Sequence, residues 1–272
     1  MSGEGNEHGK IRIGVYALTS CYGCQLMFAT VSRIMEIYDA VDIKSYHMLS
    51  SASSPHEKVD VAFVEGSVST EKDLVELREI RKNSKKLVAM GACAINGGVQ
   101  SWKGPEESYE DMFSSVYGDS HIMYIGMKAQ PIEKFVEVDY RLPGCPPEED
   151  EIEYFVSTFV FGTWPEERDY PVCHECRISG SPCILIENGA PCLGSVTLAG
   201  CGARCIKHGV PCIGCRGPVT HENAWFDSLA REFMEKGYDR EYITERMAMF
   251  GSHDPTLMER LGKIFEGGEE DE

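Results

Sequence analysis

The chain has 272 residues and a formal net charge of −18 at pH 7, with 42% hydrophobic and 26% charged residues. This composition is typical of a globular protein, and no apolar run approaches the roughly 18 residues of a membrane-spanning helix, so we expect no membrane insertion. Phosphate backbones would repel so acidic a chain, which argues against nucleic acid as a partner and favours other proteins.

The N-terminal segment MSGEGNEHGK has neither the layout of a secretory signal nor a twin-arginine pair, so we expect a cytoplasmic location. The cytoplasm keeps ordinary thiols reduced, and a hydrophobic core of this size needs no disulfide bonds to stabilise it. The twelve cysteines are therefore expected to be ligands rather than disulfide partners.

Residues 1–165 predict strands and helices in alternation. Apolar runs predict strands at 12–18, 41–48, 59–64, 86–90 and, less regularly, 135–142, and helical spacing predicts helices at 26–38, 70–81 and 151–161. Thr70 and Asp73 form a capping pattern at the start of the second helix, in which Leu74, Leu77 and Ile80 would face the core. Such alternation is typical of an α/β fold with an open parallel sheet.

Short turns replace this pattern between residues 166 and 220. Gly-x-Pro-Cys occurs three times, ending at Cys183, Cys192 and Cys212, and regular apolar runs are scarce, so we expect a loop-rich domain whose fold depends on bound metal. Residues 221–272 read as a helical extension that ends in an acidic tail. One helical face there carries Trp225, Phe226, Leu229, Ala230 and Phe233, which we expect to pack in a core or at an interface.

The first group of cysteines, called the first set below, follows the ends of predicted strands: Cys21, Cys24, Cys93 and Cys145. Loops beyond the carboxyl ends of parallel strands meet at one rim of a sheet, so these four thiolates can converge there. Gly91 and Gly144 lie beside two of them and would allow backbone to approach a bulky inorganic core. We therefore predict an iron-sulfur cluster at this rim.

The other eight cysteines are the right number for two further four-thiolate sites. In sequence order they divide into a second set, Cys173, Cys176, Cys183 and Cys192, and a third set, Cys201, Cys205, Cys212 and Cys215. Two-cluster ferredoxin folds can exchange a ligand between clusters, so other divisions stay open. The total is three 4Fe-4S clusters with no cysteine left over.

The main alternative is a zinc-bound structural subunit of a multiprotein complex, because zinc uses the same thiolates. Zinc ribbons usually join two C-x-x-C pairs, whereas each set here contains at most one such pair. A thioredoxin-like role for Cys21 and Cys24 would leave ten cysteines unexplained. His174 and His208 lie beside cysteines, but the twelve cysteines already supply all the ligands that three four-thiolate sites need. We expect Glu65, at a strand end, to be solvated.

Several segments resemble the small subunit of nickel-iron hydrogenases. They are LTSCYGCQ at 18–25, VEGSVST at 64–70, GACAINGGVQSW at 91–102 and GCPP at 144–147, followed by CHEC, GSPCILIENGAPCLGSVTLAGCGARC and PCIGCRGP. The resemblance covers about four fifths of the chain and is greatest to the cytoplasmic, multisubunit, NAD(P)-linked type, which includes sulfhydrogenase delta subunits. Respiratory quinone-reductase subunits of related fold differ, because their cluster motif begins with adjacent cysteines.

The resemblance implies a flavodoxin-like domain that holds a proximal 4Fe-4S cluster on the first set, with a distal cluster on the second set and a medial cluster on the third. Two positions depart from many relatives. Cys173 stands where membrane-linked relatives place a histidine, and Cys205 supplies a fourth thiolate where relatives often hold a 3Fe-4S cluster.

The function implied by the resemblance is electron transfer within a hetero-oligomeric hydrogenase. The hydrogen-activating nickel-iron site would lie on a large subunit, so this chain would have no catalytic residues of its own. It would pass electrons to or from a flavin/iron-sulfur partner. The sequence leaves open which acceptor takes the electrons: NAD, NADP, ferredoxin, a deazaflavin, polysulfide or a bifurcating flavin. It also leaves open the direction of the reaction.

Overall fold

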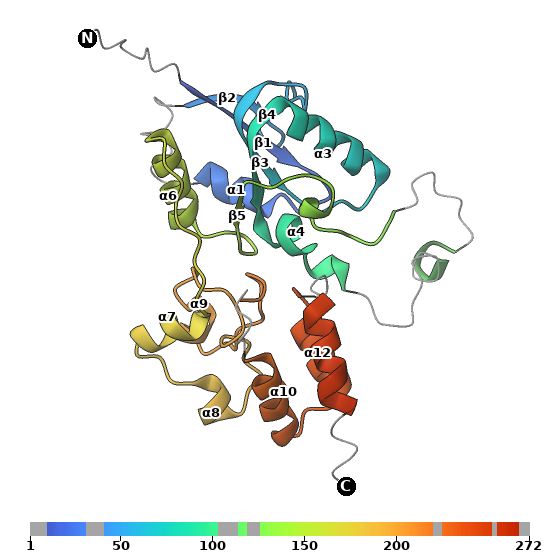
Figure 1. The fold of residues 1–272 in the computed structure, drawn as a ribbon, viewed down its shortest axis with the longest axis vertical. Helices are drawn as coiled ribbons and strands as arrows, with labels where there is room; N and C mark the ends of the chain where they lie inside the picture. The colour runs from blue at the N-terminus through green and yellow to red at the C-terminus, as the bar shows by residue number, and fades with distance from the viewer. Residues whose placement is uncertain are drawn as a thin grey trace.

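A computed structural model describes residues 10–30, 41–102, 114–118, 126–219, 225–251 and 255–266. Its strands are β1 (Ile11–Ala17), β2 (Val41–Tyr46), β3 (Val59–Glu65), β4 (Ser84–Met90) and β5 (Tyr140–Leu142), and they form a parallel sheet in the order β2-β1-β3-β4-β5. Figure 1 shows this sheet between helices, above a second region of loops and short helices. The predicted α/β fold with an open parallel sheet is confirmed.

The last predicted strand is shorter than its sequence pattern. Residues 135–142 form strand only over Tyr140–Leu142, after the 3₁₀ turn η2 (Ile132–Lys134). The side chain of Asp139 accepts a hydrogen bond from the amide of Leu87 at 2.9 Å and pairs with Lys86. Because this carboxylate takes the place of a backbone acceptor, the ladder begins only at the next residue.

Helices cover both faces of the sheet. One face is covered by α1 (Gly23–Thr30) and α6 (Glu149–Val160), whereas α3 (Glu71–Asn83) covers the other. The Thr70 side chain accepts from the amide of Asp73, as the capping pattern predicts, while Leu77 and Ile80 are buried and Leu74 is partly buried. The predicted helix over 26–38 is present as far as Thr30, and its remainder lies outside the described residues.

The second region contains α7 (Val172–Ile178), α8 (Ile184–Asn188) and α9 (Arg204–Lys207), and then α10 (Phe226–Glu235), α11 (Arg240–Ala248) and α12 (Pro255–Glu266). The glycines of the three Gly-x-Pro-Cys repeats all have positive φ angles, as tight turns require. Cysteines and C-terminal helices share one hydrophobic core, so packing as well as metal can stabilise the loops. The boundary between 166–220 and 221–272 stays a prediction.

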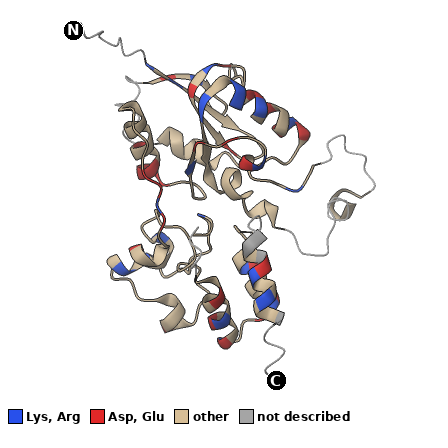
Figure 2. Ribbon diagram, viewed as in Figure 1, with Lys and Arg blue, Asp and Glu red and all other residues tan. Residues whose placement is uncertain are grey.

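The predicted packing face of the C-terminal segment is buried in the core except at its first residue. Phe226, Leu229, Ala230 and Phe233 are buried, but Trp225 is 70% exposed. Trp225 is the N-cap residue of α10, outside the helical repeat, so helical spacing does not fix where its side chain points. Charged residues of both signs occur along α3, α10 and α12 (Figure 2). No helix in the described ranges is long and apolar enough to cross a bilayer.

Replacing Phe155 with alanine should destabilise the fold. Its ring is 1% exposed and packs against Phe63, Tyr140 and Trp164, so truncation leaves a cavity that costs about 3–5 kcal/mol. The measurement is the midpoint of urea unfolding of the anaerobically purified chain, monitored by circular dichroism. Phe161→Ala is the control, because that ring is 84% exposed and its loss should change stability by less than about 0.5 kcal/mol. Equal midpoints would contradict this packing.

Candidate metal centres

The structure brings the first set together at the carboxyl end of the sheet. Cys21 lies in the loop after β1, Cys24 in α1, Cys93 in the helix α4 (Gly91–Asn96) after β4, and Cys145 in the loop after β5. The amide of Ala92 donates to the carbonyl of Gly144 at 2.7 Å, which ties the loop of Cys93 to that of Cys145. The predicted convergence of these loops on one rim is therefore observed.

The thiols of the first set are electrostatic neighbours. Burial raises the pKa of the Cys24 thiol, and Glu65, Cys93 and Cys145 raise it further. Burial likewise raises the pKa of Cys93 and of Cys145, and Cys21 raises both again. A thiolate here would face other negative groups in a desolvated site, so it needs a positive partner to be stable.

Two glycines allow the backbone to pass close to these sulfur atoms. Gly91 has φ +84°, and a Cβ added there would lie 2.3 Å from Cys24 Sγ. Gly98 has φ +73°, and its Cβ would lie 2.5 Å from Gln100 Oε1 and 2.8 Å from Cys93 Sγ. Both positions need a backbone conformation that side chains rarely adopt, and a side chain at either position would collide with a cysteine sulfur. Glycine at both positions thus keeps these two sulfur atoms clear of a neighbouring side chain.

The interpretation of Glu65 as a solvated acid was wrong. Its side chain is 1% exposed at the end of β3, and Oε2 accepts the amide of Cys24 at 3.1 Å. Burial raises its pKa, while hydrogen bonds from Cys24 and Gln25 lower it. The strand β3 lies beside β1 where the strand order reverses, so Glu65 stands at the switch point of the sheet and holds the start of α1.

The second set gathers around α7. Cys173 and Cys176 lie on that helix, and the amide of Cys173 donates to the carbonyl of Gly194, two residues after Cys192. A Cβ at Gly194 would lie 3.4 Å from Cys173 Sγ and 3.6 Å from Cys192 Sγ. Burial raises the pKa of Cys173 to about 11, with further increases from Cys192, Cys176 and Cys183. Cys173 and Cys176 thus each lie near both Cys183 and Cys192.

The third set lies next to the second. Burial raises the pKa of Cys215 to about 11, and Cys201, Cys145 and Cys205 raise it further. Burial also raises the pKa of Cys212 to about 12, and both Cys192 and Cys215 add to this increase.

A direct contact joins these two sets, since the amide of Cys212 donates to Cys192 Sγ at 3.3 Å. Glu175, between the two cysteines of α7, accepts hydrogen bonds from the amides of Gly200 and Ala203 around Cys201.

The two histidines beside these cysteines lie at the surface. His174 is exposed and packs against the ring of Tyr170, and His208 is exposed at the end of α9.

The chemistry of these donors suits metal better than thiol catalysis. No disulfide joins any of the twelve cysteines, and burial raises the pKa of thiols in every set, whereas reactive cysteines have lowered pKa values. Metal binding would compensate the thiolate charge. Within the described ranges, no three His, Cys, Asp or Glu side chains are arranged to hold a single metal ion. The residues present fit iron-sulfur clusters held by thiolates, with glycines that let the backbone approach the sulfur atoms.

Known proteins share this sequence and fold. The family described as "NADH ubiquinone oxidoreductase, 20 Kd subunit" matches residues 21–159. The sulfhydrogenase 2 subunit delta of Pyrococcus furiosus is 38% identical over 214 residues, which cover 78% of this chain and 89% of that protein. The chain belongs to the family of nickel-iron hydrogenase small subunits. The expected family is thereby confirmed.

Solved structures agree with this membership. A chain in the crystal structure of NAD⁺-reducing NiFe hydrogenase, in the H2-reduced state, is 30% identical with a TM-score of 0.52, covering 58% of this chain and 95% of that chain. The NiFeSe hydrogenase of Desulfomicrobium baculatum shares the fold at 18% identity, with a TM-score of 0.56 over 79% of this chain and 98% of that one. The small subunit is thus part of an oxidoreductase, whose activity belongs to the complex.

Gly91→Ala tests whether the first set holds a 4Fe-4S cluster, because the new methyl group would lie 2.3 Å from Cys24 Sγ and would displace that sulfur. If it does, iron analysis after anaerobic purification should show about four fewer iron atoms per chain than in the wild type, the loss of one 4Fe-4S cluster. The control is Gly180→Ala. Gly180 also has a positive φ, +70°, but nothing lies within 4 Å of its Cβ position, so iron should be retained. Equal iron in the two variants would contradict the assignment.

Proposed function

We propose that this small subunit relays electrons through three 4Fe-4S clusters in a nickel-iron hydrogenase complex. The observation that carries the proposal is the convergence of four cysteines from three strand ends on one rim, where Gly91 lets the backbone approach Cys24 Sγ. The first set would hold the proximal cluster. The second and third sets would hold the distal and medial clusters.

Each cluster would supply a one-electron carrier held by thiolates, with a potential tuned by nearby charge and hydrogen bonds. The protein's part is to fix the separation of the sites and to exclude water. The contact between Cys212 and Cys192, and the electrostatic coupling of Cys145 with Cys215, support a continuous path through the three sets.

Exposed apolar side chains around the first set support docking of a large subunit that carries the nickel-iron site. Tyr22, Leu26 and Val99 are each about half exposed, and Cys21 and Cys145 are exposed beside them. Apolar side chains grouped at a surface mark interaction sites. The proximal cluster would then face the hydrogen-activating partner.

A second partner would bind near the second set, where Ile178 and Ile186 are exposed on either side of exposed Cys183. We propose a flavin/iron-sulfur subunit there that uses NAD(P) or another soluble carrier. The relative from Pyrococcus furiosus is a subunit of a sulfhydrogenase, and one structural relative reduces NAD⁺. A cytoplasmic location agrees with such an acceptor and is part of the same proposal.

Cys93→Ser tests the proximal assignment in the intact complex. Hydrogen-dependent dye reduction should fall at least about tenfold. Replacing residues that only hydrogen-bond to metal ligands already lowers metal affinity or activity on that scale, and Cys93 would be a ligand itself. Hydrogen isotope exchange at the nickel-iron site needs no electron relay and should be retained as an internal control. Undiminished dye reduction would show that Cys93 is no ligand on the electron path.

A further inference from the structure

Arg216 directly follows Cys215 and is only 3% exposed, which is rare for a guanidinium group. Its Nε donates to the carbonyls of Leu198 at 3.1 Å and Ala199 at 2.8 Å, and Nη1 donates to the carbonyl of Pro143 at 2.8 Å. One side chain thus bonds to backbone segments more than fifty residues apart in the sequence.

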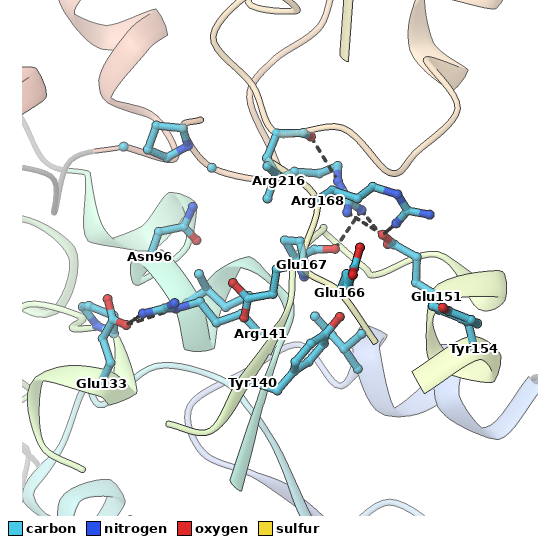
Figure 3. A pocket seen from close by; sticks show the side chains of 18 of the residues that line it. Asn96, Glu133, Tyr140, Arg141, Glu151, Tyr154, Glu166, Glu167, Arg168 and Arg216 are labelled. Atoms are coloured by element: carbon cyan, nitrogen blue, oxygen red, sulfur yellow. Dashed lines mark hydrogen bonds and ion pairs between the residues drawn. The ribbon is translucent and has the colours of Figure 1, made fainter. Parts of the chain in front are cut away.

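Glu151 supplies the charge partner for Arg216. Nη1 donates to Glu151 Oε2 at 2.8 Å and Nη2 to Oε1 at 2.7 Å, a bidentate pair in which both side chains are buried. Arg168 also contacts Glu151. Figure 3 shows both arginines converging on this carboxylate at the wall of a cavity of about 520 Å³. Because Glu151 lies on α6, the pair joins the sheet domain to the cysteine-rich region.

Gly200 leaves the space that this ion pair fills. A Cβ at that position would lie 2.1 Å from Arg216 Nη2 and 2.4 Å from Glu151 Oε1, and the φ of Gly200 is +130°. Any side chain there would displace the pair. The residue just before Cys201 is therefore glycine for a reason that concerns Arg216 rather than the cysteine itself.

The bonds of Arg216 lead to loops that carry cysteines of two different sets. Pro143 is two residues before Cys145 of the first set, and Ala199 is two residues before Cys201 of the third. The guanidinium thus lies between the first and third sets.

We propose that Arg216 is a positioning residue that fixes the separation between the clusters of the first and third sets, and hence the rate of electron transfer between them. This inference rests on the proposed function. Electron tunnelling falls steeply with distance, so a rigid link between the two cysteine loops would control the rate. Stability alone does not explain the pair, because apolar residues of similar volume often stabilise a core as well as a buried ion pair does.

Arg216→Lys in the full complex is the decisive variant. It keeps the positive charge but loses the planar fork that bonds to Glu151 and to three carbonyls at once. Iron and sulfide content should stay at the wild-type level. The magnetic interaction between the reduced proximal and medial clusters, seen as splitting in electron paramagnetic resonance, should weaken, and hydrogen-dependent dye reduction should fall while isotope exchange is retained.

The matched control is Arg204→Lys. Arg204 pairs with Glu148 across the same junction, but its side chain is 65% exposed, and exposed pairs contribute little. This variant should keep the wild-type splitting and dye reduction. If Arg216→Lys does not fold, Arg216→Gln combined with Glu151→Gln removes both buried charges together, and it should show the same weakened splitting with full iron.

Wild-type splitting in the folded Arg216 variants would overturn the proposal. Loss of iron from the third set alone would also overturn it, since Arg216 would then support a single cluster. The same spectra of the wild-type complex test the proposed function separately. A wild type without 4Fe-4S signals would refute the proposed electron relay, whatever the Arg216 variants show.

Discussion

Burial of cysteine thiols beside one another is the constraint on which the rest of this structure depends. In each set the pKa of at least one thiol is raised chiefly by burial, as at Cys24, Cys173 and Cys212. A bare thiolate in such a place is costly, and several together repel one another. A bound cluster removes that cost, because its iron ions share the thiolate charge. The cysteine sites are thus consistent with metal binding and unsuited to nucleophilic thiol chemistry.

Backbone geometry determines where the thiols meet. Parallel strands bring their carboxyl ends to one rim, which places loops from distant parts of the sequence side by side. Positive-φ glycines then let the backbone pass close to sulfur, most clearly at Gly91. The second and third sets lack a sheet and depend on turns at the Gly-x-Pro-Cys repeats and on a core shared with α10, α11 and α12.

Much of this arrangement follows from local sequence. The buried run over 59–64 and the cap at Thr70 depend on neighbouring residues, so strand β3 and helix α3 lie where they were predicted. Glu65 and Arg216 could not be recognised in the same way. Their burial depends on contacts with Cys24 and with Glu151, distant in sequence, and a charged residue near a turn is usually solvated. Asp139 likewise shortens β5 through a side chain that no strand pattern reveals.

The central claim is that the twelve cysteines hold three clusters. Analysis of iron, acid-labile sulfide and zinc in the anaerobically purified small subunit tests it most directly. Three 4Fe-4S clusters require about twelve iron and about twelve sulfide per chain, with zinc near zero. Stoichiometric zinc with almost no sulfide would contradict the account and would favour a zinc-bound structural subunit instead.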